Sequence, residues 1–566
     1  MSRSRDGAPV RVAAALLAVA AVGLAARLWA LGWRVAHQDE ARVSSWILHY
    51  MDVGGWEYRA IIHGPFLPHV NGAVFDLLGP SDFTMRLFVA LVGSLLPLAA
   101  WLYREHLTDV ELVALGAFLA ANPVLLYYSR FMRNDLLLAA FMFVAFGLFV
   151  RAIDTGKAWY LYAGALPFAL AFTTKENSLL YPVCWLGALV LVFDGRLVLA
   201  DADEDASRYE AARSHLGRAL RGVWRYKLDL ALVAFQVAAI VVAFYAPKPE
   251  FYRILANPDL AGGVLRAATF GTYEEFVGLW GSTSTKEHSY IAFLKHDVEV
   301  LLAGGSALSI AAVVGFLHDR YASDRPRAVV AFAFYWGAFS VLGYPAVSDI
   351  AAPWTAVNAL VPLAIPAAVG VGVVVRYGRS GIETDRATRA RLAAAILVVA
   401  VVGTGAVAAQ TTYANAQGPN NPLVQYAQPS GQMQGTLTDI EERAAENEGV
   451  DVLFYGEEFY NAEEAQGGSP SLSIDDYDDP DDDYNSGGYE GWFDRLPLPW
   501  YLELYDANVS STTDPSAVAS SDAPVVVTLE GEEEPVREGL EARGYDRVVH
   551  QGYQHSRPVV FYVAPS

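Results

Sequence analysis

Long apolar runs fill most of the first 410 residues of this chain and constrain its fold more than any other feature. A helix that crosses a bilayer needs about 20 consecutive, mostly apolar residues. Eleven runs come close to this length, at residues 11–32, 84–103, 109–128, 135–151, 158–174, 177–193, 228–246, 299–317, 328–345, 353–375 and 392–410. We therefore expect a polytopic α-helical membrane protein with about eleven transmembrane helices. The first run lacks a clear cleavage site, so we interpret it as a retained helix rather than a signal peptide.

Residues 411–566 form a second region with a different composition. They carry 30 acidic side chains against six arginines and no lysine, whereas residues 1–410 are close to neutral. A surface this acidic keeps a protein hydrated in very high salt and is typical of halophilic archaea. We interpret the charge as an adaptation to the solvent, and it argues against binding of nucleic acid.

The acidic region has the pattern of a soluble α/β domain. A helical stretch at 437–446 precedes a strand-like run at 450–455, and this alternation is repeated by the segments 524–529, 536–543 and 559–563. The acidic stretch 474–483 lacks the glycine and the spacing of an EF-hand loop. We interpret it as a solvated insert rather than a calcium site.

Basic residues in the short loops indicate the orientation, because lysine and arginine accumulate on the cytoplasmic side of a membrane. With the N-terminus in the cytoplasm, the cytoplasmic loops hold most of the cations, and an odd number of spans places residues 411–566 outside the cell membrane. Two external loops are long, 33–83 and 247–298. The first contains two stretches that resemble short interfacial helices, 41–50 and 66–77, and we expect the second to lie over the membrane surface.

Two adjacent acids, Asp39 and Glu40, follow the first apolar run. At a membrane boundary, one such carboxylate can take a proton from a hydroxyl group while the other positions it or coordinates a divalent cation. If the protein uses a metal, Mg²⁺ or Mn²⁺, these two acids are the candidate ligands. The alternative is structural, because acids at this point would cap the N-terminus of the helix that follows.

Three cations, Arg130, Arg133 and Lys175, lie in short loops on the external side, against the topology rule. If residues 130–133 are helical, the two arginines project from one face and can bind phosphate oxygens together. The alternative is that both extend to the membrane interface, as arginines at span ends commonly do. Asp135 is a candidate second acid or a partner for one of the arginines.

A turn at His63, followed by glycine and proline, adds a hydrogen-bond donor in the first external loop, although such a turn also fits an ordinary helix start. Neither His37 nor His63 has a partner at metal-ligand spacing, and the chain has no phosphate-binding glycine loop and no serine-centred elbow. This argues against a nucleotide-driven pump. The single cysteine, Cys184, excludes an intrachain disulfide bond.

Taken together, the acid pair in the first external loop and the arginine-rich span end with a following aspartate resemble the GT-C superfamily of membrane glycosyltransferases. The layout is similar to protein O-mannosyltransferases and bacterial aminoarabinose transferases, and more specifically to the haloarchaeal flippase-activity-associated family of the N-glycosylation pathway. The resemblance covers about residues 10–200. A Pro353-Trp354 turn also resembles one in the archaeal family.

The resemblance implies a polyprenyl-phosphate sugar donor, with Asp39 at the catalytic position and Glu40 as its companion. It implies that Arg130, Arg133 and Lys175 hold the lipid phosphate. We expect His63 to be a further phosphate-binding residue. It stands where the aminoarabinose transferases carry a lysine, and this departure from their pattern argues against aminoarabinose as the substrate.

Two hypotheses follow from this resemblance. In the first, the protein transfers a sugar from a dolichyl-phosphate or similar lipid to a glycan or protein acceptor at the external membrane face, in protein glycosylation. In the second, it handles or presents the lipid-linked sugar without catalysis. The hypotheses differ at Asp39, because only a transferase requires this acid.

Overall fold

The computed structural model describes residues 8–201, 208–280, 288–348, 350–425, 428–462, 491–551 and 558–565. The chain divides into two compact units. The first, here the membrane unit, contains residues 1–29, 57–67 and 87–415, and the second, here the α/β unit, contains residues 30–56, 68–86 and 416–566. This division differs from a boundary at residue 410, because most of the first external loop is grouped with the C-terminal region. The acidic insert 474–483 lies outside the described residues.

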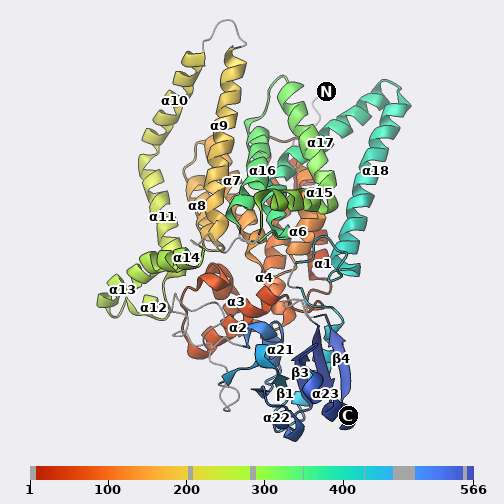
Figure 1. Ribbon diagram of the computed structural model, residues 1–566. Coiled ribbons are helices and arrows are strands. Elements are labelled where there is room, and N and C mark those ends of the chain that lie inside the picture. The colour runs from red at the N-terminus through yellow and green to blue at the C-terminus, as the bar shows by residue number, and fades with distance from the viewer. Residues whose placement is uncertain are drawn as a thin grey trace. The chain divides into compact units, whose positions relative to one another are not determined.

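In the part of the chain that the structure describes, nine helical stretches are long and apolar enough to cross a bilayer (Figure 1). This confirms the predicted polytopic α-helical architecture. The stretches are Val10–Leu28 (in α1, Ala8–Leu28), Asp82–Tyr103 (α4, Asp82–Leu95, and η3, Leu96–Tyr103), Asn134–Thr155 (α7), Glu176–Gly195 (η4, Glu176–Leu179, and part of α9, Leu180–Asp201), Lys227–Tyr245 (α11), Tyr290–Tyr321 (α15), Ala328–Val347 (α16), Pro353–Glu383 (η8, Pro353–Ala356, and α17, Val357–Glu383) and Ala387–Ala414 (α18, Ala387–Ala409, and η9, Gln410–Ala414).

Two of the eleven predicted runs form shorter helices. The run 109–128 is divided into α5 (Asp109–Ala121) and α6 (Pro123–Tyr128). The side chain of Asn122 accepts hydrogen bonds from the first backbone N–H groups of α6, at 3.0 and 3.2 Å, and Pro123 occupies the first turn, where its missing N–H costs nothing. The run 158–174 forms α8 (Trp159–Phe172), which is apolar but only 14 residues long.

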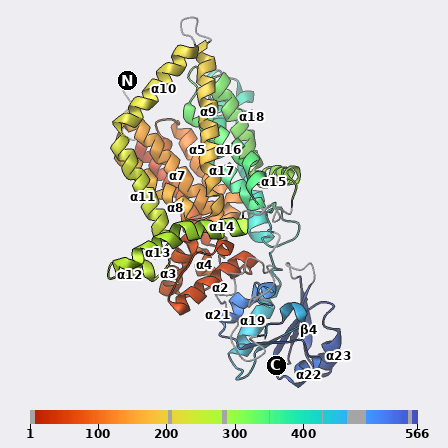
Figure 2. The same cartoon turned by 60° about the vertical axis from the view of Figure 1, so that its left-hand side comes forward.

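The second long external loop folds into short helices, α12 (Glu250–Arg253), α13 (Ala261–Arg266) and α14 (Thr272–Trp280). In Figures 1 and 2, α13 and α14 run across the direction of α11. They and their connections expose apolar side chains, among them Leu255, Phe270 and Tyr273. A position on the membrane surface remains a prediction for this loop.

The α/β unit is built on a five-stranded sheet in the order β2-β1-β3-β5-β4. The strands β1 (Val452–Tyr455), β3 (Val525–Leu529) and β5 (Val559–Val563) coincide with the predicted strand segments, and the predicted segments 437–446 and 536–543 coincide with helices α19 (Met433–Ala444) and α23 (Glu534–Ala542). β1 is parallel to β2 (Val509–Thr512) and β3, whereas β5 is antiparallel to β3 and β4 (Asp546–His550). The two strands missing from the prediction, β2 and β4, are the edge strands, which are only partly buried and so lack a strong apolar pattern.

The two predicted helices of the first external loop are present as α2 (Gln38–Val53) and α3 (Phe66–Leu78). Within the α/β unit, α2 packs against α21 (Leu498–Leu504) of the C-terminal region. The ring of Phe75 on α3 stacks on that of Trp500 on α21, with 5.8 Å between the ring centroids. The C-terminal region therefore shares a core with the segment that carries the acid pair.

Candidate functional site

The acid pair lies in the first turn of α2, which starts with a reciprocal cap. His37 is the N-cap residue, and its Nδ1 accepts a hydrogen bond from the backbone N–H of Asp39 at 3.0 Å. The carboxylate of Glu40 accepts a hydrogen bond from the backbone N–H of His37 at 3.0 Å. This is the geometry of a capping box, with histidine in the place usually taken by serine or threonine. The capping interpretation is therefore confirmed for Glu40.

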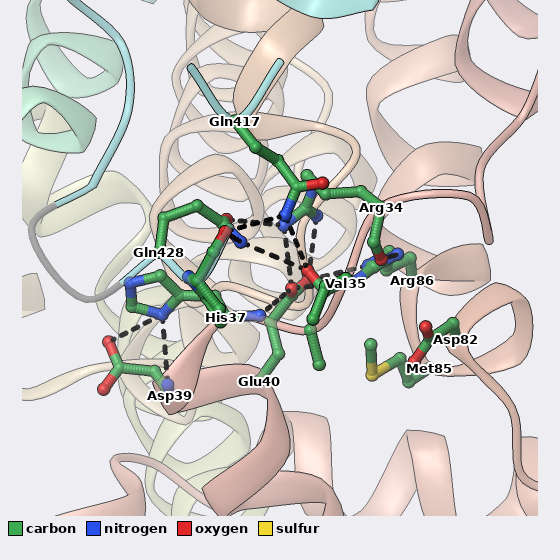
Figure 3. A network of polar contacts seen from close by, with 12 residues as sticks. Arg34, Val35, His37, Asp39, Glu40, Asp82, Met85, Arg86, Gln417 and Gln428 are labelled. Atoms are coloured by element: carbon green, nitrogen blue, oxygen red, sulfur yellow. Dashed lines mark hydrogen bonds and ion pairs between the residues drawn. The ribbon is translucent and has the colours of Figure 1, made fainter. Parts of the chain in front are cut away.

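Glu40 is fully buried between two arginines (Figure 3). Its oxygens accept from Arg34 at 3.0 and 3.3 Å and from Arg86 at 3.0 Å twice. Burial alone would raise the pKa of Glu40, but the two guanidinium groups and their hydrogen bonds outweigh it and hold this pKa well below its usual range. Glu40 is thus a permanently charged anchor for the start of α2.

Asp39 points to a different environment, as expected for successive residues about 100° apart around a helix. Its side chain is 18% exposed, and Oδ1 accepts from Arg42 at 3.0 Å. Its Oδ2 lies 3.8 Å from Nδ1 of His37. Of the two neighbouring acids, Asp39 is therefore the one that solvent can reach.

Residues 130–133 are not helical, so Arg130 and Arg133 do not project from one helix face as they would in a helix. α6 ends at Tyr128, and Arg133 is the extended N-cap residue of α7. Arg130 Nη1 donates to three carbonyls at the end of α1, those of Ala26, Arg27 and Trp29, at 3.1, 2.7 and 2.6 Å. Such contacts satisfy the last carbonyls of a helix and favour a positive charge there. Arg130 therefore has a structural role at the C-terminal end of α1.

Arg133 belongs to what we call the cation cluster, formed by Arg133, Asp135, Lys175 and Trp354. The guanidinium of Arg133 lies 3.7 Å from the centre of the Trp354 ring, and its Nε lies 3.5 Å from Oδ2 of Asp135. Lys175 Nζ lies 3.6 Å from Oδ1 of the same carboxylate. Asp135 is buried, and neither of its oxygens has a hydrogen-bond partner among the described residues. Two cations thus share one carboxylate, which leaves the cluster with net positive charge.

The His63 turn lies against the turn that carries Lys175. Gly64 N–H donates to the carbonyl of Thr174 at 3.2 Å, and Phe66 N–H donates to that of Thr173 at 2.9 Å. A Cβ on Gly64 would lie 2.4 Å from the Thr173 oxygen, so only glycine permits this approach. The sequence pattern indicated both turns but not their contact.

Glu176 joins the same group and was not among the predicted site residues. It lies 3.0 Å from Nδ1 of His63 and accepts a hydrogen bond from Tyr58 at 2.9 Å. Burial and the adjacent Glu176 raise the pKa of Tyr58 far above its usual value, so Tyr58 remains a hydrogen-bond donor. The only signal for Glu176 in the sequence is its position next to Lys175 in a tight turn.

The donor set around the acid pair does not favour a divalent cation. Both oxygens of Glu40 already accept hydrogen bonds from guanidinium groups, whose charge would repel a metal ion. Among the residues that the structure describes, no group of three or more histidine, cysteine, aspartate or glutamate side chains could hold a metal. Binding of Mg²⁺ or Mn²⁺ by Asp39 and Glu40 remains a prediction.

Comparisons with known proteins agree with this architecture. Residues 62–201 match the family described as dolichyl-phosphate-mannose-protein mannosyltransferase, and residues 433–564 match the Agl23 flippase-associated protein C-terminal domain. Comparison with curated proteins gives no match. The fold is similar to that of ArnT from Cupriavidus metallidurans in the apo state, with 14% identity, a TM-score of 0.55 and coverage of 97% of this chain and 99% of that chain. The same protein bound to undecaprenyl phosphate gives 16% identity, a TM-score of 0.54 and the same coverage.

The membrane helices, the small sheet domain and the likeness to ArnT define a polytopic membrane protein of the GT-C glycosyltransferase fold. Within that class, the chain is related to the Agl23 flippase-associated proteins, as the match over residues 433–564 indicates. The GT-C-like fold and the relation to the flippase-associated family predicted from the sequence are confirmed, whereas the haloarchaeal source and the glycosylation pathway remain predictions.

Proposed function

We propose that this protein transfers a sugar from a polyprenyl-phosphate carrier to the hydroxyl group of a glycan or protein acceptor. The observation that carries the proposal is the cation cluster, in which Arg133 and Lys175 share the buried Asp135 and Arg133 rests on Trp354. A planar guanidinium in a fixed orientation is suited to two phosphate oxygens, and Lys175 adds a second positive charge. One of the fold relatives is described as bound to undecaprenyl phosphate, a ligand of this class.

The proposed reaction assigns Asp39 as the base. The acceptor oxygen forms a bond to the anomeric carbon while the bond from that carbon to the phosphate oxygen breaks. The hydroxyl proton passes to Asp39, and the bonding electron pair leaves with the polyprenyl phosphate. Arg133 and Lys175 stabilise the negative charge that develops on this phosphate. Glu40 has a positioning role, because its oxygens are held by Arg34 and Arg86.

The remaining site residues have secondary roles in the proposal. His63, oriented by Glu176 next to Lys175, is a further donor to the phosphate. Arg130 supports the end of α1 rather than the lipid. The N-terminus is cytoplasmic and residues 411–566 are extracellular at the cell membrane, as the distribution of basic loop residues indicates.

A second candidate function is handling of the lipid-linked sugar without catalysis. It is favoured by the match of residues 433–564 to a flippase-associated domain. This alternative uses the same cation cluster but does not need Asp39.

Reconstitution in liposomes tests the proposal. Purified protein is offered radiolabelled dolichyl-phosphate sugars and candidate acceptors, with and without EDTA, and both lipid binding and product are measured. Labelled product from the wild type supports the transferase, and its loss with EDTA would establish a metal requirement. Binding of the lipid that depends on Arg133, without product from any acceptor, would favour lipid handling instead.

A further inference from the structure

Helix α21 of the C-terminal region contacts the stretch of backbone that leads into the acid pair. The hydroxyl group of Tyr501 accepts a hydrogen bond from the backbone N–H of Ala36 at 2.7 Å and donates one to Oδ2 of Asp82 at 2.8 Å. The indole N–H of Trp500 donates to Oδ1 of Asp82 at 3.0 Å. Ala36 precedes Asp39 by three residues, and Tyr501 is almost completely buried.

Gln428, also in the C-terminal region, makes a second contact with the same stretch, at Arg34 and Val35 (Figure 3). Gln428 accepts a hydrogen bond from Arg34 at 3.1 Å and donates one to the carbonyl of Val35 at 3.2 Å. Arg34 is also the residue that pairs with Glu40. The C-terminal region thus binds three consecutive residues, 34–36, through one side chain and two backbone groups.

The third support comes from α4, the helix that carries Asp82. One turn after Asp82, Arg86 donates to both oxygens of Glu40 and to the carbonyls of Leu31 and Arg34, at 2.9–3.0 Å. Tyr501 therefore links the backbone before α2 to the same helix that anchors Glu40. Every group in this chain of contacts belongs to the α/β unit.

We propose that the C-terminal domain positions Asp39 for the reaction, with Tyr501 as a positioning residue that acts through Ala36 and Asp82. The inference rests on the proposed function, because it takes Asp39 as the reacting acid. Its physical basis is that buried backbone groups need hydrogen-bond partners, so the path of residues 34–36 depends on partners supplied by α21 and Gln428. The C-terminal domain, which is similar to a flippase-associated domain, thereby has a role in the chemistry.

Replacement of Tyr501 by phenylalanine tests this role, since it keeps the ring and removes both hydrogen bonds. The matched control is Tyr545→Phe, which removes a buried hydroxyl group that donates to the carbonyl of Ala523 at 2.8 Å elsewhere in the domain. Backbone hydrogen exchange of residues 35–40 is measured in the full-length protein, together with the transfer rate and the Michaelis constant for the donor lipid. We expect Tyr501→Phe to speed exchange of this segment about tenfold and to lower kcat about tenfold with KM unchanged, whereas Tyr545→Phe changes neither.

Unchanged exchange at residues 35–40, or faster exchange with an unchanged kcat, would overturn the proposal. If Tyr501→Phe does not fold, Gln428→Ala tests the same claim from the other contact, with the same expected result. Faster exchange in the variant while the wild type transfers no sugar would support the hold on residues 34–36 and reject the proposed function. The two claims therefore fail by different observations.

Discussion

Glu40 and Arg86 form a completely buried ion pair although 46 residues separate them in the sequence. Nε and Nη2 of Arg86 each lie 3.0 Å from a different oxygen of Glu40. A two-point pair of this kind fixes distance and orientation together, so α2 begins at a defined place relative to Arg86. Two adjacent acids consequently have different tasks, Glu40 as an anchor and Asp39 as the accessible carboxylate.

Loss of the Glu40 charge is expected to be costly. In Glu40→Gln, the buried Arg34 and Arg86 lose the carboxylate that they share, a change that costs about 3–5 kcal/mol in comparable pairs. Asp39→Asn weakens a partly exposed pair with Arg42 and is expected to cost about 1 kcal/mol or less. Thermal unfolding of both variants in the same detergent measures the difference, and equal losses would show that Glu40 is not an anchor.

The stability contributed by Glu40 depends on pH in a defined direction. Its folded-state pKa is lowered, so the unfolded chain binds the proton more readily than the folded chain does. The contribution is complete above the ordinary glutamate pKa of about 4.3 and declines as the pH falls below it. We expect the gap in Tm between wild type and Glu40→Gln to be wide at pH 6 and to narrow towards pH 3. A gap of constant width would contradict this assignment.

Arg133 and Arg130 are expected to respond differently to replacement by alanine. Arg133→Ala removes the proposed charge-assisted contact to phosphate and should weaken binding of the polyprenyl phosphate by about 1.5–3 kcal/mol. Arg130→Ala removes the partner of three α1 carbonyls and should lower Tm while leaving lipid affinity within about twofold. Arg133→Lys should retain little of the wild-type lipid affinity, because lysine lacks the planar group that stacks on Trp354.

Titration of the purified variants with fluorescent polyprenyl phosphate checks this pair of expectations. Arg253→Ala, in an exposed position of the second external loop, serves as a charge-matched control. Equal loss of affinity in the Arg130 and Arg133 variants would refute the distinction.

The close approach at Gly64 is expected to tolerate no side chain. Gly64→Ala places a methyl group 2.4 Å from the Thr173 carbonyl and should cost about 1–3 kcal/mol while separating His63 from Glu176. Gly72→Ala in α3 is the control, because its nearest atom would be 3.8 Å away. Both Tm and lipid affinity should fall in Gly64→Ala, and neither should fall in Gly72→Ala.

The membrane helices and the main strands could be predicted from the sequence because each is encoded locally by its own apolar pattern. The elements that differ from the prediction also have local causes. Asn122 and Pro123 divide one apolar run into two helices, and the edge strands β2 and β4 are too polar to be recognised. The helix starts around Asp39 and His63 were also indicated by the sequence.

The arrangement of the site could be predicted only in part, because it depends on contacts between distant segments. Nothing in the sequence marked Arg34 and Arg86 as the partners of Glu40, since ion pairs over such separations leave no periodic pattern. Arg130 and Arg133 looked equivalent, yet one contacts α1 and the other Trp354. The association of the first external loop with the C-terminal region was likewise beyond the reach of local patterns.

The central claim is that Asp39 carries out proton transfer in a sugar-transfer reaction, and a comparison of Asp39→Asn with Asp52→Asn tests it most directly. Asp52 lies on the same helix, exposed, and matches the change in charge. Both variants are assayed for affinity towards the dolichyl-phosphate sugar and for the rate of a single turnover. The account predicts that Asp39→Asn binds the donor within about twofold of wild type but transfers the sugar about 10²–10⁴ times more slowly, while Asp52→Asn is unaffected. Transfer by Asp39→Asn at the wild-type rate would contradict it.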